Sequence, residues 1–373
     1  MATSRTIRNY SLTLVESASV INHALQVLRP HLPTCLPLYR RIQFGRFFDA
    51  TCLLTNIDLG IKATSQAKPS GGTDGNAAAD ESPPWVIAFV DRSCRPETEV
   101  WIFGSWEASP PPVDATKAWS AVDDLVLEIV RTMKTLPLAQ SIHQDVLDAE
   151  TASKANGTTD RDSVGLSRAD YAGHGSNPNI MLWGAVHERT APILQRLGML
   201  AQEYKTNVVP NYTFLFDIAT LPPPRPLPQG LKWGVAQPES FALIRSRTQI
   251  PRQDRTMAVL PSLAIYPTAH SDTSSPTRAP VAWVFIGLDT SLTTLHVEPE
   301  WRGKGLAKLI TAKLFREKMG RFFEDDGMVE KLGYGFVVVG NKASEGMCRS
   351  LGGRSEWGSY WLRVDLSTAS QTS

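Results

Sequence analysis

Apolar residues follow strand-like and helix-like patterns in turn along most of the chain. Helical spacing of apolar residues marks residues 15–28, 119–133 and 238–256. Short runs rich in β-branched and aromatic residues predict strands between the helices. These runs lie at residues 85–90, 100–103, 212–218, 231–234, 260–266, 281–287, 293–297, 335–339 and 359–366. Helices that fall between consecutive strands predict an α/β protein with a mixed, twisted sheet and helices on both faces.

One segment near the C-terminus indicates a ligand. A strand at Thr293–Val297 ends on a loop that contains Gly303 and Gly305, and an amphipathic helix begins at Leu306. The glycines permit a tight turn that leaves the amides of the first helical turn without partners. Together with the positive end of the helix dipole, these amides predict a site for a diphosphate.

A second strand and helix follow this segment. Residues 335–339 predict a short buried strand, and Asn341 is placed to cap a helix that ends at Gly352. Ser344 and Cys348 lie on one face of this helix, because they are four positions apart.

The loop before the first of these helices resembles the acyl-CoA-binding motif of the GNAT superfamily of N-acyltransferases. That motif is a strand, then Arg/Gln-x-x-Gly-x-Gly/Ala, then a helix; here Arg302 opens the pattern, with Val297 and Pro299 upstream. A Rossmann fingerprint would need a third glycine, and a P-loop would need Gly-Lys-Ser/Thr. The resemblance implies that Arg302 supplies positive charge beside the pyrophosphate of coenzyme A. The residues implied to hold that pyrophosphate are Gly303, Lys304, Gly305, Leu306 and Ala307.

The same resemblance assigns roles to the neighbouring strand and helix. In the superfamily the motif strand splays from its neighbour, and its backbone pairs with pantetheine and polarises the thioester carbonyl. This role falls to the backbone of Leu295, His296 and Val297. Asn341 and Ser344 are implied to touch the pantetheine or the thioester.

Two further motifs narrow the resemblance to a branch of the superfamily. Many members carry a tyrosine as general acid where this chain has Cys348. The Asn-x-x-Ser-x-x-Met-x-x-x-Leu-Gly variant that begins at Asn341 resembles the glycine N-acyltransferase-like branch instead. Residues 287–292, Gly-Leu-Asp-Thr-Ser-Leu, resemble the same branch.

Three residues are alternative catalytic candidates. Glycine N-acyltransferases have a glutamate near the start of the motif strand, and the matching position here is Ser291. Asp289 is the nearest carboxylate and could act directly or through water, or serve only as a turn residue. His296 has a suitable intrinsic pKa for a base, but strand alternation turns it away from Leu295 and Val297. It could then be a packed strand histidine.

Other side chains near these motifs have plainer interpretations. We expect Glu298 and Glu300 to be solvated loop acids, with Glu300 close enough to pair with Arg302. Trp357 and Trp361 could wall an acceptor pocket, and core packing is the alternative for both.

Polar and proline-rich segments divide the chain. Residues 221–230 predict a stiff, polyproline-type linker between an N-terminal lobe, residues 1–220, and an acyl-CoA-binding catalytic domain, residues 231–373. Segments near residues 63–84 and 150–179 are predicted mobile insertions.

The N-terminal lobe also shows a fainter resemblance to the glycine N-acyltransferase-like branch. Residues 32–39 resemble the start of the non-catalytic lobe in that branch, and residues 180–183, with Leu194 and Leu197, resemble its last helix. The resemblance implies a second, degenerate GNAT-like lobe before the catalytic one.

Composition excludes several other classes of protein. The chain has 373 residues, enough for two domains, and 38 Lys and Arg against 37 Asp and Glu. Without a basic stripe or an apolar run of about 18 residues, we expect neither nucleic-acid nor membrane partners. The four cysteines lack paired spacing, which predicts reduced thiols and no metal site. We expect a cytoplasmic protein; a mitochondrial presequence at residues 1–15 is the alternative.

The first functional hypothesis is an acyl-CoA-dependent N-acyltransferase. It would move an acetyl or other acyl group from acetyl-CoA or another acyl-CoA to an amine, a small molecule or amino acid, by direct attack on the thioester. A protein or peptide N-acetyltransferase is the second hypothesis. The third is a non-catalytic CoA-binding regulatory protein, which the absent tyrosine and Ser291 favour. The sequence does not indicate an oligomeric state.

Overall fold

The structure describes most of the chain. The predicted insertions fall largely outside the described residues: residues 63–82, 150–160 and 163–164 are not described. The computed structural model describes residues 6–13, 17–48, 50–60, 83–137, 161–162, 165–268, 279–323 and 331–370.

The elements follow the predicted alternation closely. Before the proline-rich segment they are β1 (Arg8–Ser11), α1 (Ser17–Leu28), α2 (Leu36–Gln43), β2 (Cys52–Thr55), β3 (Val86–Val90), β4 (Val100–Gly104), α3 (Ser105–Ala108), α4 (Thr116–Thr135), α6 (Arg168–Ala172), β5 (Ile180–His187), α7 (Ala191–Arg196) and β6 (Asn211–Asp217). After it they are β7 (Leu231–Gly234), α8 (Phe241–Ser246), α9 (Asp254–Met257), β8 (Ser262–Pro267), β9 (Ala282–Ile286), β10 (Leu292–Val297), α10 (Leu306–Lys318), β11 (Leu332–Val338), α11 (Lys342–Ser350) and β12 (Arg354–Asp365).

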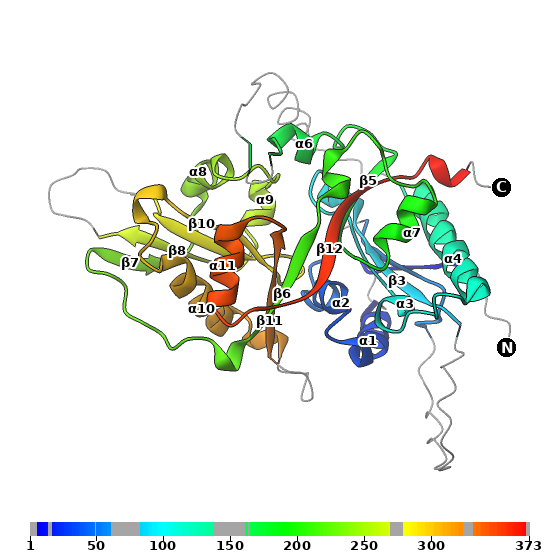
Figure 1. The fold of residues 1–373 in the computed structure, drawn as a ribbon, viewed down its shortest axis with the longest axis horizontal. Helices are drawn as coiled ribbons and strands as arrows, with labels where there is room; N and C mark the ends of the chain where they lie inside the picture. The colour runs from blue at the N-terminus through cyan, green and yellow to red at the C-terminus, as the bar shows by residue number, and fades with distance from the viewer. Residues whose placement is uncertain are drawn as a thin grey trace, which may run out of the picture.

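Among the described residues, the strands form one mixed sheet of twelve strands. Its order is β1-β2-β3-β4-β5-β12-β6-β11-β10-β9-β8-β7, and Figure 1 shows β12 and β6 crossing its centre. The C-terminal strand β12 pairs with β5, while β6 pairs with β11. Each half of the chain therefore receives a strand from the other. The domain division at residues 221–230 stays a prediction, and strand pairing crosses it.

The two halves repeat one topology. In the first half, β3 and β4 are antiparallel, and β4 then runs parallel to β5 after α4. In the second half, β9, β10, α10 and β11 follow the same course. Each parallel pair has a single registered residue pair, Val100 with Trp183 and Leu292 with Gly335. Both halves therefore contain two parallel strands that separate after one point of contact.

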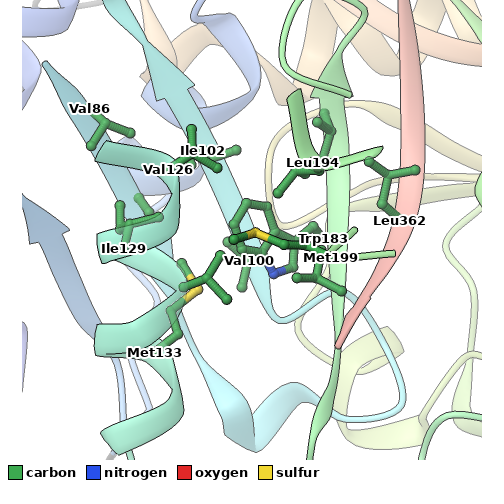
Figure 2. Packing of buried hydrophobic residues seen from close by; sticks show 14 of the residues in the cluster. Val86, Val100, Ile102, Val126, Ile129, Met133, Trp183, Leu194, Met199 and Leu362 are labelled. Carbon is green, nitrogen blue, oxygen red and sulfur yellow. The ribbon is translucent and has the colours of Figure 1, made fainter. Parts of the chain in front are cut away.

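Helices cover both faces of the sheet, which confirms the predicted mixed α/β fold. On β3, Val86 and Ala88 pack under α4 and α7, whereas Ile87 and Phe89 pack under α1 and α2. In the second half, α10 and α11 cover one face and α8 and α9 the other. Figure 2 shows the core beneath α4, with labelled side chains Val86, Val100, Ile102, Val126, Ile129, Met133, Trp183, Leu194, Met199 and Leu362.

The prediction of a helix at residues 180–183 is wrong. These residues begin β5, a strand whose eight residues are all buried. A central strand with both faces covered reads as a continuous apolar run, which periodicity cannot distinguish from a buried helix. Leu194 does lie on a helix, the short α7, and Leu197 follows it.

The structure describes part of the segment near residues 150–179, whose character as a mobile insertion stays a prediction. Its described part, residues 165–179, contains α6, which Ser167 and Asp170 close with a reciprocal capping box. Arg95 then donates to the carbonyls of His174 and Asn177 at 2.8 and 2.7 Å. A helix cap and a buried arginine therefore hold this described part of the segment.

A buried acid, Glu107, links α3 to the loop after β5. Its carboxylate accepts a hydrogen bond from the Thr190 hydroxyl, which itself accepts from Trp106 Nε1 at 3.0 Å. Burial raises the pKa of Glu107 to about 8. The folded protein therefore holds a proton on Glu107 at neutral pH that the unfolded chain has released.

This proton makes the stability of the protein depend on pH. As the pH rises from about 6 to about 8.5, Glu107 in the folded protein loses its proton, so the free energy of unfolding should fall by about 2.5 kcal/mol from this group. Glu107→Gln mimics the protonated acid and should lose that part of the fall. Urea denaturation of both proteins at the two pH values measures the difference, and equal slopes with pH would contradict it.

Candidate active site

The loop between β10 and α10 presents a row of free backbone amides. Gly303 and Gly305 both have φ of +75°, which glycine adopts without the steric penalty of other residues. Gly305 directly precedes α10, whose first amides have no partner within the helix. Within the described part of the chain, the amides from Gly303 to Ala307 donate to no protein acceptor. This is the arrangement that a diphosphate site requires.

The two basic residues of this loop make different contacts. Arg302 Nε donates to the Val297 carbonyl at 3.0 Å and ties the loop to the end of β10. Lys304 Nζ lies 4.3 Å from the centre of the Trp301 ring. Both basic side chains are exposed beside the amide row. Glu300, expected to pair with Arg302, forms no such ion pair within the described chain.

A basic groove begins at Gly305. It has a volume of about 580 Å³ and lies between α10 and the proline-rich segment. Arg316 fixes that segment, because its guanidinium donates to the carbonyls of Leu221 and Pro222 at 2.6 and 2.7 Å. The charged residues that line the groove are Arg225, Lys308, Lys313, Arg316 and Glu317.

Strand β10 separates from β11 beside this loop. After the one pair of Leu292 with Gly335, β10 is paired only with β9, and a bulge interrupts that pairing between Thr293 and His296. Thr294 within the bulge has a φ of +55°. The backbone from Thr293 to Val297 therefore has no strand partner on the β11 side. Leu295, His296 and Val297 lie in this stretch, as their predicted role requires.

The helix after β11 begins as predicted. The Asn341 side chain accepts from the Ser344 amide at 3.2 Å, so both residues form the N-terminal cap of α11. Cys348 is buried in the last turn of α11, and burial raises the pKa of its thiol to about 12. Its thiol is therefore neutral at physiological pH and is no nucleophile.

A cavity of about 220 Å³ lies where the two halves meet. The first half contributes Glu97 and Trp101, and the second contributes residues from the turn before β10. Asp289 and Ser291, two of the three catalytic candidates, line it, and so does Trp361. Its walls are formed by Pro96, Glu97, Thr98, Trp101, Leu166, Tyr171, Leu182, Thr206, Val209, Asn211, Ile250, Pro251, Arg252, Leu260, Gly287, Leu288, Asp289, Ser291, Leu292, Thr293, Phe336, Val338, Trp361 and Arg363.

Asp289 and Ser291 form a hydrogen-bonded pair at this cavity. Asp289 Oδ1 accepts from the Ser291 amide at 3.0 Å and from the Ser291 hydroxyl at 2.6 Å. Its other oxygen accepts from Trp101 Nε1 at 3.2 Å, and Tyr334 donates to its backbone carbonyl. Asp289 is thus both the predicted turn residue and a wall of the cavity.

The third candidate, His296, lies elsewhere. Its ring stacks on Trp283 with 4.7 Å between ring centres, and it is not among the residues that line the cavity. Burial is the main cause that lowers its pKa, and Glu298, 3.6 Å from its Nε2, opposes the shift. The expectation that Glu298 is solvated is wrong, because Glu298 is buried and accepts from Arg247 Nε at 2.9 Å.

Three charged residues of the cavity, Glu97, Arg252 and Arg363, were not predicted from the sequence. Arg252 donates to the hydroxyls of Thr293 and Thr294 at 2.7 and 3.0 Å, so it holds the bulge of β10. Glu97 accepts from the Gln253 amide at 2.9 Å, and burial raises its pKa. Arg252 falls in the stretch 238–256 predicted as helical, but that spacing carries no chemical signal, and only folding brings Arg252 close to Glu97.

The corresponding loop of the first half is built differently. There α3 follows β4 directly, and Trp106 is buried where the second half has its glycine loop. Among the described residues, no group of three or more His, Cys, Asp or Glu could hold a metal ion. No described helix is long and apolar enough to cross a membrane.

Two protein-family models match the chain. A family model described as the acyl-CoA N-acyltransferase verG N-terminal domain matches residues 11–214, and one described as FR47-like protein matches residues 273–362. A solved Drosophila protein is 14% identical, covers 96% of this chain and 98% of its own, and has a TM-score of 0.53. No curated protein matches the chain.

Two other solved structures are similar over nearly the whole chain. A tandem GNAT protein from the clavulanic acid biosynthesis pathway is 10% identical, with 96% of this chain and 98% of its own covered and a TM-score of 0.39. A GCN5-related N-acetyltransferase from Sphaerobacter thermophilus is 11% identical, with 97% and 96% covered and a TM-score of 0.40. Because the verG model spans more than half of the sequence, this chain belongs to the family of the acyl-CoA N-acyltransferase verG N-terminal domain, in the GNAT superfamily, with a tandem GNAT-like fold.

Proposed function

We propose that the protein transfers an acetyl or other acyl group from acyl-CoA to the amine of a small molecule or an amino acid. One observation carries the proposal: β10 joins the row of free amides at Gly303–Ala307 to the cavity that Leu292 and Thr293 line. A cofactor with its diphosphate on the amides and its arm along β10 would deliver its thioester to that cavity. The basic groove at Gly305 suits its remaining phosphate.

The reaction would consist of one displacement. The amine nitrogen attacks the thioester carbonyl, the C–N bond forms, the C–S bond breaks, and coenzyme A leaves as a thiolate. Free backbone groups at the β10 bulge would polarise the carbonyl, and positioning supplies much of the rate. The amine proton would pass to Asp289 through the Ser291 hydroxyl, which already donates to it at 2.6 Å. The thiolate takes a proton from water.

The size of the cavity favours a small acceptor over a protein. A volume of about 220 Å³, lined by residues of both halves, suits a small amine better than an extended peptide. A place in the glycine N-acyltransferase-like branch is part of this proposal; its support is the motif at residues 287–292, which forms the turn before β10.

A CoA-binding regulatory protein is the second candidate. The contacts of Asp289 favour it, because Trp101 and Ser291 already donate to both carboxylate oxygens. A carboxylate with its oxygens engaged in this way is less free to accept the proton of an amine.

Turnover and binding together separate the two candidates. The protein is incubated with an amine library and mixed acyl-CoAs, thiol release is followed against a no-amine blank, and acylated products are identified by mass spectrometry. We expect amine-dependent thiol release and a matching acylated amine. Acetyl-CoA binding by calorimetry without release for any amine would support the regulator instead.

A further inference from the structure

Arg363 is a buried cation in the wall of the cavity between the halves. It lies on β12, the strand that runs between β5 and β6, and only 1% of its surface is exposed. The residue therefore belongs to the cavity through the strand exchange that joins the halves.

The partners of Arg363 are all neutral. Its guanidinium donates to the Thr206 hydroxyl and to the Tyr171 carbonyl, both at 2.6 Å. Its Nε has no hydrogen-bond partner, and no carboxylate in the described part of the chain forms an ion pair with it. The buried Arg95 differs, because Glu99 lies 3.7 Å from it.

The other charges of the cavity are already engaged with one another. Arg252 lies in the field of Glu97 and Asp289, and these are the acids among the lining residues. A buried guanidinium without a counter-ion is costly, so charges in such places are normally paired or await a ligand. The lining holds two acids and two arginines, so its formal charges balance; both acids act on Arg252, and none is paired with Arg363 in the described part of the chain.

The remaining wall describes the rest of the ligand. Apolar side chains form most of it, including Leu182, Val209, Leu260 and Leu288. Arg363 holds a planar, five-donor group that matches a carboxylate.

We propose that this cavity binds an amine substrate with an apolar body and a single carboxylate, and that Arg363 pairs with that carboxylate. The inference rests on the proposed function. It assigns both halves of the chain to substrate recognition, because β12 carries the specificity residue and the first half closes the cavity around the ligand.

The carboxylate that pairs with Arg363 could belong to the amine acceptor or to a dicarboxylic acyl group on coenzyme A. The test therefore compares apolar amino acids with their methyl esters, each with acetyl-CoA and with succinyl-CoA. We expect wild-type kcat/KM to favour the free acid by about 30-fold or more with acetyl-CoA, the loss typical of an unmatched buried charge. A preference for succinyl-CoA that is equal for acids and esters would place the carboxylate on the acyl group and overturn the assignment to the acceptor.

Variants then test the residue itself. In Arg363→Gln the acid-to-ester ratio should fall toward one, while Arg363→Lys should keep part of it. Arg168→Gln is the matched control, because the Arg168 guanidinium donates to the backbone carbonyls of Arg245 and Thr248 but does not line the cavity. The control should leave the ratio unchanged; an unchanged ratio in Arg363→Gln would overturn the inference. Thermal unfolding identifies any variant that fails to fold. If Arg363→Gln does not fold, the acid-to-ester ratio of kcat/KM in the wild type tests the inference by itself.

A binding measurement tests this inference independently of the proposed function. Saturation-transfer NMR measures whether the amino acid or its ester binds wild-type protein in the presence of coenzyme A, with no turnover required. If the free amino acid bound without being acylated, the proposed function would be contradicted and the carboxylate site would stand. Acylation of acids and esters at equal rates would keep the function and overturn the site.

Discussion

Gly305→Glu is expected to abolish acetyl-CoA binding. A glutamate at this position would place a negative charge beside the amides of Gly303–Ala307, where the diphosphate is expected, and like charges repel strongly at close range. It would also strain the chain, because the φ of +75° at Gly305 disfavours any residue with a β-carbon. Open space surrounds the added β-carbon, so the folded protein should survive. Titration calorimetry should show an affinity at least about 100-fold weaker.

Two variants separate charge from backbone strain. Gly305→Asn adds a neutral side chain that tolerates the left-handed conformation, and its affinity should fall by less than about tenfold. Gly198→Glu makes the same substitution at a glycine with φ of +67° and open space, away from the loop. It should bind acetyl-CoA as the wild type does. Unchanged affinity in Gly305→Glu would remove the diphosphate site from the proposal.

The parts of the site that the sequence predicted are local in the chain. The strand, the glycine loop and α10 depend on residues within about two helical turns of one another, so spacing alone predicts them. Asn341 is a similar case, because an N-cap depends on three or four consecutive residues. Local signals were also enough for the alternation of strands and helices, and hence for the class of fold.

The parts that the sequence did not predict depend on distant segments. Glu97, Arg252 and Arg363 line one cavity although more than 100 residues separate each from the next. In the sequence Glu298 resembles a solvated loop acid, but in the fold it contacts Arg247 and His296. The exchange of β6 and β12 is invisible for the same reason, since strand periodicity carries no information about the partner strand.

The exchanged strands tie the first half to the cavity, although the first half has no glycine loop of its own. It contributes the cavity wall through Trp101 and Glu97, and it receives β12 in return. If the halves came apart, the cavity would lose one wall and β12 would lose its pairing with β5. The first half therefore contributes to the cavity through packing.

Arg252→Met is expected to lower kcat/KM by about 100-fold, or about 2.7 kcal/mol in the barrier. Arg252 is the contact that holds Thr293 and Thr294, and Thr294 has a left-handed backbone that is costly for a β-branched residue. Without the guanidinium the bulge should relax and misplace the groups expected to polarise the thioester, which is costly even over a short distance. Steady-state thiol release measures the change.

The acetyl-CoA affinity of this variant should stay within about threefold of wild type, because the amide row at Gly303–Ala307 makes no contact with Arg252. Arg255→Met is the matched control: Arg255 is also near Glu97 but donates to Gln253 and Ser93 and does not line the cavity. It should keep most of the activity. If both variants lost turnover equally, the cause would be the shared charge near Glu97, and the role of Arg252 in holding the bulge would be wrong.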